Sequence, residues 1–184
     1  MPKQIAVRET ESHNNMIAHQ SAPWIRVLPR LVAERREPLE KEVCISITNP
    51  KQSPAQLADF ADVLRLGFHD TDRAGGRATL MSRPDAKAVL AFAHQYRNAP
   101  LTVHCEFGAS RSVAVGLFLA AWLYRPLFVA ATDVLIPNRW VVNQLRAAAA
   151  WRGFCPLDHR LLACAAFGNP DYLTKHIPSI SHHD

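Results

Sequence analysis

Apolar and polar positions along this chain follow two periods, one typical of strands and one typical of helices. Short runs rich in β-branched and other apolar residues predict strands at residues 24–28, 43–47, 62–68 and 101–103. Helical spacing, with proline or capping residues at the starts, predicts helices at residues 29–36, 84–97, 113–124 and 137–150. Because strands alternate with helices, we expect an α/β fold with a central, mostly parallel sheet of four to five strands flanked by helices.

The remaining segments are less regular. Residues 127–136 are apolar and fit either a helix or a packed connector, and residues 157–167 predict a final short helix. The polar residues 1–20 have no periodicity, which is typical of a flexible arm, with a weak helix as the alternative. Residues 169–184 are expected to be a C-terminal tail. A length of 184 residues then predicts one domain, at residues 21–168.

The candidate chemistry lies between the strand that begins at residue 101 and the helix that follows it. The strand leads into His104-Cys105, five residues follow, and Arg111-Ser112 opens the helix. Backbone N–H groups at a helix start are unpaired and bind anions. A cysteine thiolate is a strong nucleophile, and the planar guanidinium of Arg111 matches two oxygens of a phosphate. The segment therefore combines a nucleophile with an anion site.

His104-Cys105-x5-Arg111-Ser112 resembles the signature loop of cysteine-dependent protein tyrosine and dual-specificity phosphatases. The resemblance implies that Cys105 attacks a phosphate monoester, giving a phosphocysteine intermediate that water hydrolyses without a metal or other cofactor. It also implies that Arg111 and the loop N–H groups bind the phosphate, Ser112 assists breakdown of the intermediate, and His104 hydrogen-bonds the loop. The loop residues that would contribute N–H groups are Glu106, Phe107, Gly108, Ala109 and Ser110.

The resemblance also implies a proton donor, an Asp on a loop some thirty-odd residues before the cysteine. Asp70 lies 35 positions and Asp72 lies 33 positions before Cys105, both in the polar loop after the third predicted strand. The string Gly67-Phe68-His69-Asp70-Thr71 favours Asp70, with Asp72 as the alternative acid. Downstream, Asn138 matches an asparagine that supports the phosphate loop in dual-specificity enzymes.

The overall likeness is greatest to small bacterial or phage-type tyrosine-phosphatase-like proteins. The long tryptophan-led acid loop and the phosphotyrosine-reading insert of receptor-type enzymes are missing, so a shallow site is expected. The substrate is then a phosphorylated protein or a small phosphate ester. Two alternatives stay open: the same chemistry on a phosphoinositide, nucleotide or RNA 5′-phosphate, and a non-catalytic phosphate-binding pseudophosphatase.

Charge and composition add little to this picture. The net charge of +5 suits an anionic substrate and leaves open contact with nucleic acid or anionic lipid, which no motif indicates. The longest apolar run, residues 113–124, is too short to span a bilayer, and the first residues lack a signal core. The four cysteines lack metal-site spacing. Because a catalytic cysteine must stay reduced, we expect a soluble, cytoplasmic protein.

Overall fold

The structure is a computed structural model, and it describes residues 23–73, 75–130 and 135–150. The strands are β1 (Ile25–Pro29), β2 (Val43–Thr48), β3 (Asp62–Gly67), β4 (Leu101–Cys105) and β5 (Leu127–Val129). The helices are α2 (Arg30–Arg35), α3 (Arg83–Gln95), α4 (Arg111–Leu123) and α5 (Arg139–Ala148). The five strands form one parallel sheet in the order β3-β2-β4-β1-β5, which confirms the predicted fold class.

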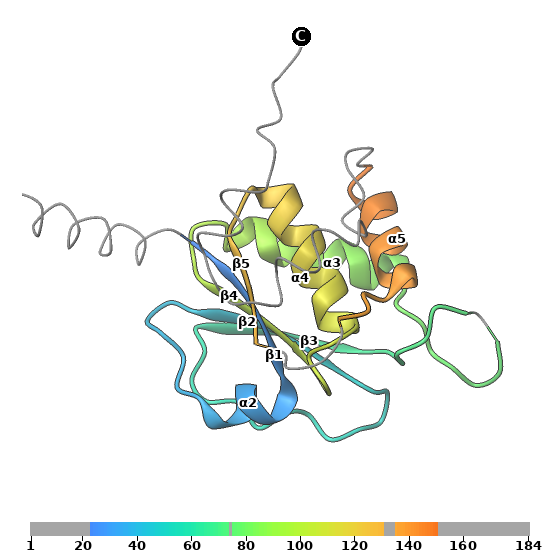
Figure 1. The fold of residues 1–184 in the computed structure, drawn as a ribbon, viewed down its shortest axis with the longest axis horizontal. Helices are drawn as coiled ribbons and strands as arrows, with labels where there is room; N and C mark the ends of the chain where they lie inside the picture. The colour runs from blue at the N-terminus through green and yellow to red at the C-terminus, as the bar shows by residue number, and fades with distance from the viewer. Residues whose placement is uncertain (1–22, 74, 131–134, 151–184) are drawn as a thin grey trace, which may run out of the picture.

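Helices cover the two faces of the sheet unequally. Figure 1 shows α3, α4 and α5 together on one face and α2 on the other. The core lies between the sheet and the three helices, where Ile45, Val103 and Phe118 are fully buried. Gly116 lets α4 pack directly on β1, because a Cβ atom there would lie 2.5 Å from Cγ2 of Val27. Within the described part of the chain, no helix is long and apolar enough to cross a membrane.

The central strand β4 lies between β1 and β2. Because the three strands are parallel, their carboxyl ends lie at the same end of the sheet. In the register of β1 with β4, Pro29 lies beside Cys105. The segments that follow these three strands therefore gather at the carboxyl end of the sheet, which is where open α/β sheets bind ligands. The candidate phosphate loop, residues 106–110, follows β4 at this carboxyl end.

Most predicted elements are confirmed within a residue or two at their ends. The helix predicted from residue 84 is α3, and its N-cap Ser82 forms a reciprocal pair of hydrogen bonds with Asp85. The prediction for residues 127–136 was wrong, because neither alternative included the strand β5, which pairs with β1 at the sheet edge. Three residues are too few to show an alternating pattern. The predicted arm, final helix and tail lie outside the described residues.

Candidate active site

The phosphate loop is held by neighbouring chain segments through its carbonyl groups. The backbone O atoms of Glu106 and Ala109 accept hydrogen bonds from the N–H groups of Arg30 and Ile136, at 3.2 and 3.0 Å. The N–H groups of residues 107–110 donate to no other described residue. Because these carbonyls bond to neighbouring segments while the N–H groups have no partner among the described residues, the N–H groups are available to bind an anion. The loop therefore has the backbone arrangement expected of a phosphate cradle.

Gly108 is required by the shape of this loop. Its φ of +68° lies in the left-handed region, which is accessible to glycine at no steric cost. A Cβ atom at this position would also lie 2.5 Å from the backbone N of Pro29, at the end of β1. Any larger residue would push the loop away from β1, so the close fit of the loop against its neighbouring strand depends on glycine.

Cys105 and Ser112 face each other across the loop. Cys105 ends β4 and is 1% exposed, and its Sγ atom lies 3.0 Å from Oγ of the buried Ser112 in the first turn of α4. This distance is within hydrogen-bond range for sulfur, and either atom could be the donor. The structure thus brings together two residues that lie seven positions apart in the sequence.

The Arg111 side chain is buried, at 2% exposure. Its Nη1 atom donates to the carbonyl O of Phe68 at 2.7 Å and to Oδ1 of Asn49 at 2.9 Å. Its Nε atom has no hydrogen-bond partner among the described residues, and lies 3.7 Å from Oδ2 of Asp70. One nitrogen of the guanidinium therefore anchors the side chain, and another has no hydrogen bond within the described residues and lies near Asp70.

Asp70 hydrogen-bonds a residue of the phosphate loop, whereas Asp72 forms no hydrogen bond or ion pair with that loop. Oδ1 of Asp70 accepts hydrogen bonds from Oγ of Ser110 at 2.8 Å and from Nδ2 of Asn138 at 3.0 Å. Asn138 is the N-cap of α5, where its Oδ1 accepts from the N–H of Val141. Asp72 is exposed and forms no hydrogen bond or ion pair with another described residue. The structure therefore places Asp70, together with Asn138, at the loop.

His104 is completely buried directly before Cys105. Burial, and secondarily the positive charge of Arg30, lower the pKa of its imidazole to about 4. Neither ring nitrogen has a hydrogen-bond partner among the described residues, so the hydrogen bond to the loop that the resemblance implied is not made there. His104 is consequently neutral at neutral pH and supports the strand end by packing.

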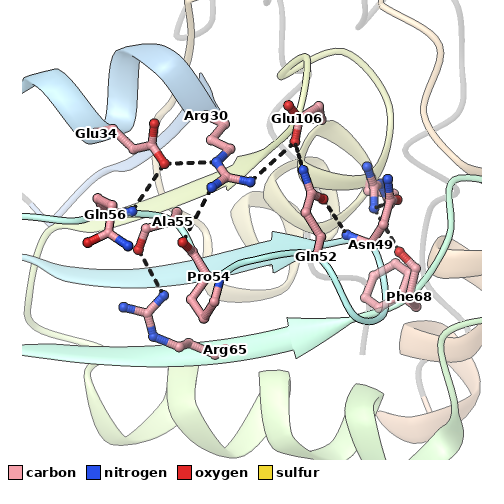
Figure 2. A network of polar contacts seen from close by, with 11 residues as sticks. Arg30, Glu34, Asn49, Gln52, Pro54, Ala55, Gln56, Arg65, Phe68 and Glu106 are labelled. Atoms are coloured by element: carbon pink, nitrogen blue, oxygen red, sulfur yellow. Dashed lines mark hydrogen bonds and ion pairs between the residues drawn. The ribbon is translucent and has the colours of Figure 1, made fainter.

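A second polar network holds the other end of the loop, and Figure 2 shows it from close by. Oε2 of Glu106 accepts from Nε2 of Gln52 at 2.9 Å and lies 3.7 Å from Nη1 of Arg30. Oε1 of Gln52 accepts from the N–H of Asn49, which also contacts Arg111. The Phe107 side chain, by contrast, is 77% exposed and does not fix the loop.

Sequence reasoning missed Asn49 and Gln52. Both lie in the turn after β2. Ligand-binding side chains gather at the carboxyl ends of the strands in a parallel sheet. A polar residue directly after a buried strand was therefore a usable signal at Asn49. Gln52 had no such signal, because its contact with Glu106 joins positions 54 residues apart.

Comparisons with known proteins found similarity only at the level of solved structures. No family model matches the chain, and no curated protein sequence matches it. The chain is similar to human DUSP28, with 22% identity, a TM-score of 0.46, and coverage of 71% of this chain and 94% of that one. It is also similar to the human tyrosine phosphatase-like serine/threonine/tyrosine-interacting protein, with 20% identity, a TM-score of 0.43, and coverage of 67% and 89%. The expected likeness to bacterial or phage-type proteins stays a prediction.

Proposed function

We propose that this protein is a cysteine-dependent phosphate monoester hydrolase of the protein tyrosine and dual-specificity type. The observation that carries the proposal is the meeting of three groups at one loop whose N–H groups donate to no other described residue: the Cys105 thiol, the buried Arg111 guanidinium and the Asp70 carboxyl. A nucleophile, an oxyanion site and a proton donor are the parts that such a hydrolysis needs.

In the first step, the loop N–H groups and Arg111 bind the phosphate oxygens. The thiolate of Cys105 attacks phosphorus, so that an S–P bond forms while the P–O bond of the ester breaks. The electron pair of that bond goes to the leaving oxygen, and Asp70 supplies the proton that this oxygen needs. The alcohol or phenol leaves, and the phosphocysteine remains.

In the second step, a water molecule attacks the phosphorus of the phosphocysteine. The S–P bond breaks, its electron pair returns to sulfur, and the Asp70 carboxylate takes a proton from the water. The hydroxyl of Ser112, 3.0 Å from Sγ, donates to the sulfur as its negative charge develops. Inorganic phosphate leaves, and Asp70 is protonated again for the next turnover. Asn138 acts as a positioning residue, because its amide bonds Asp70 while its oxygen caps α5.

We further propose phosphorylated proteins or small phosphate esters as substrates, in a reducing compartment such as the cytoplasm. The thiolate chemistry supports this compartment, since an oxidised Cys105 cannot attack phosphorus. Cys44 is a contrasting thiol, because burial raises its pKa to about 12. It therefore provides the matched control for the function of Cys105.

The test is hydrolysis of p-nitrophenyl phosphate with EDTA present, comparing wild type, Cys105→Ser and Cys44→Ala. We expect Cys105→Ser to lose turnover, Cys44→Ala to retain it, and vanadate to inhibit the wild type. Activity that survives in Cys105→Ser, or that depends strictly on a metal, would overturn the mechanism. Phosphate binding by a folded, reduced wild type that hydrolyses no phosphate ester would instead identify a binding module.

A further inference from the structure

His69, the residue directly before the candidate acid, forms a side-chain hydrogen bond that the proposed mechanism does not use. Its Nδ1 atom accepts from the backbone N–H of Thr79 at 2.9 Å. Its own backbone N–H donates to the carbonyl O of Thr79 at 2.8 Å. These two bonds join residues that are 10 positions apart, and Asp70 lies within the segment that they close.

The bond from Thr79 fixes the state and the direction of the imidazole. A nitrogen that accepts a hydrogen bond carries no hydrogen, so the neutral ring of His69 has its hydrogen on Nε2. His69 is half-buried, whereas Thr79 is exposed. Because water competes for an exposed N–H group, such a bond contributes little to overall stability. Its effect is therefore expected to be local, on the residues beside His69.

The backbone on the other side of His69 is already fixed. The N–H of Phe68 donates to the carbonyl O of Thr48 at 3.1 Å, which ties it to the end of β2. The carbonyl O of Phe68 accepts from Nη1 of the buried Arg111 at 2.7 Å. His69 thus starts from a backbone position that is tied to both the sheet and the phosphate-binding arginine.

The chain beyond Asp70 has less support of its own. Asp72 and Arg73 are exposed, and the N–H of Arg73 donates only to the nearby Oγ1 of Thr71, at 3.3 Å. A Cβ atom at Gly76 would meet no other atom within 4 Å, so the chain is not packed there either. The position of Asp70 therefore depends on the contacts at the ends of this segment.

Helix α5 contacts the same segment at two places. Its N-cap Asn138 donates to Asp70 at 3.0 Å. Nε1 of Trp140 donates to the carbonyl O of Met81 at 2.9 Å. Met81 lies two positions after Thr79. The histidine bonds therefore close a ring of contacts, which runs from the acid through α5 and back to the residue beside the acid.

We propose that His69 is a positioning residue for the proton donor. By accepting from Thr79, its imidazole fixes the backbone at residues 69 and 70, so that the Asp70 carboxyl stays against Ser110 and Asn138. The property that this role requires is an acceptor on Cγ, and not a charge. The inference rests on the proposed function, and deepens it by naming a residue that controls the proton transfer without touching the substrate.

The kinetic test uses two substrates that differ in their need for a proton. The leaving group of phenyl phosphate needs one, whereas that of p-nitrophenyl phosphate is stable as an anion. His69→Leu removes the acceptor and keeps a side chain of similar size. We expect its kcat on phenyl phosphate to fall roughly tenfold to 10²-fold, with a much smaller change on p-nitrophenyl phosphate. An equal loss on both substrates would overturn the inference, because a general structural effect would then explain it.

Two further variants identify the property of His69 that matters. His69→Asn carries an oxygen on Cγ, where the imidazole has Nδ1, so it keeps an acceptor for Thr79 and should restore most of the lost kcat. His94→Leu removes an exposed imidazole from α3 and is the matched control, which should leave both rates unchanged. Thermal melts confirm that each variant is folded. A His69→Asn variant as slow as His69→Leu would overturn the inference, as would a selective loss in His94→Leu.

A double variant tests whether His69 acts through Asp70. Once Asp70→Asn has removed the proton donor, adding His69→Leu should lower kcat on phenyl phosphate no further. Effects of independent residues add in the activation free energy, so their rate losses multiply. Losses that multiply in the double variant would therefore overturn the inference.

An NMR measurement tests the positioning without turnover. The side-chain amide of Asn138 donates to Asp70, so its Nδ2–H resonances report on the place of that carboxyl. We expect these resonances to shift in His69→Leu and to return towards their wild-type positions in His69→Asn. Unchanged resonances in a folded His69→Leu variant would overturn the inference.

The two readouts distinguish failure of each proposal. A wild type that hydrolyses neither substrate would overturn the proposed hydrolysis, while the Asn138 shifts in His69→Leu would still support the positioning of Asp70. Hydrolysis by wild type at a rate that His69→Leu matches on phenyl phosphate would overturn the positioning alone and leave the proposed function standing.

Discussion

Two carboxylates flank the phosphate loop in closely matched surroundings, Asp70 on one side and Glu106 on the other. Their side chains are 34% and 33% exposed, and each lies 3.7 Å from an arginine nitrogen. Each also accepts a hydrogen bond from a side-chain amide, from Asn138 at 3.0 Å and from Gln52 at 2.9 Å. Exposure and hydrogen bonding alone do not distinguish a candidate acid from a structural carboxylate.

The difference lies in the arginine that each carboxylate approaches. Asp70 approaches Arg111, which is buried and whose Nε atom has no hydrogen-bond partner among the described residues. Glu106 approaches Arg30, which belongs to α2 and already pairs with Glu34 at 2.8 Å. A phosphate bound in the loop would contact Arg111, the cation beside Asp70. Arg30, the cation beside Glu106, would keep its present partners. We infer that its place beside the cation that would bind the phosphate, and not the local polarity, distinguishes Asp70 as the candidate acid.

Removing the Arg111 side chain should have the largest effect on activity. In Arg111→Ala we expect kcat/KM to fall by roughly 10³-fold or more, because the phosphate oxygens lose their charged clamp. Steady-state kinetics on p-nitrophenyl phosphate measure this loss, with a thermal melt to confirm folding. Arg139→Ala, at an exposed position of α5, is the matched control. A loss below tenfold in Arg111→Ala would contradict the assigned role.

Removing the acid tests the comparison directly. In Asp70→Asn we expect kcat on phenyl phosphate to fall by roughly 10²-fold to 10⁴-fold, because its leaving group needs a proton. p-Nitrophenyl phosphate should be affected much less, since its leaving group is stable as an anion. The control is Asp72→Asn, measured with both substrates. If Asp72→Asn showed this selective loss and Asp70→Asn did not, the acid role would move to Asp72.

The buried imidazole of His104 makes the stability of the folded protein depend on pH. Burial lowers its pKa to about 4 in the folded protein, against about 6.5 in an unfolded chain. Between these values the unfolded state binds more protons, so the free energy of unfolding falls as the pH falls through this window. The full loss from this residue is about 3 kcal/mol.

Urea unfolding near neutral pH and near the acidic end of the window measures this loss in wild type and in His104→Gln. The variant lacks the imidazole, so its free energy of unfolding should decline less over the same window. The other titrating groups are common to both proteins and serve as the internal control. Parallel declines in the two proteins would show that His104 does not carry the effect.

Changing Glu106 should have the smallest effect. Glu106→Gln keeps an oxygen that can accept from Gln52 and loses only a partly exposed ion pair with Arg30. We expect the free energy of unfolding to fall by less than about 1 kcal/mol, and kcat/KM to change by only a few-fold. A loss as large as that of Asp70→Asn, and equally selective for phenyl phosphate, would remove the distinction between the two carboxylates.

The sequence by itself determined the local parts of this protein. Apolar periodicity located the strands and helices, since it depends on positions only a few residues apart. The loop from Cys105 to Arg111 was also recognisable, because its strand, turn and helix start are continuous in the chain. The Ser82 capping box and the helix start at Asn138 were local in the same way.

Only the tertiary structure decided which distant segments meet. The strand order and the edge strand β5 depend on pairing across the sheet, and β5 is too short to reveal itself by pattern. Asp70 reaches Ser110 over 40 positions, and Arg111 reaches Asn49 over 62. Which polar side chain meets which loop is settled by packing and register, whose energies come from long-range contacts that no local window of sequence contains.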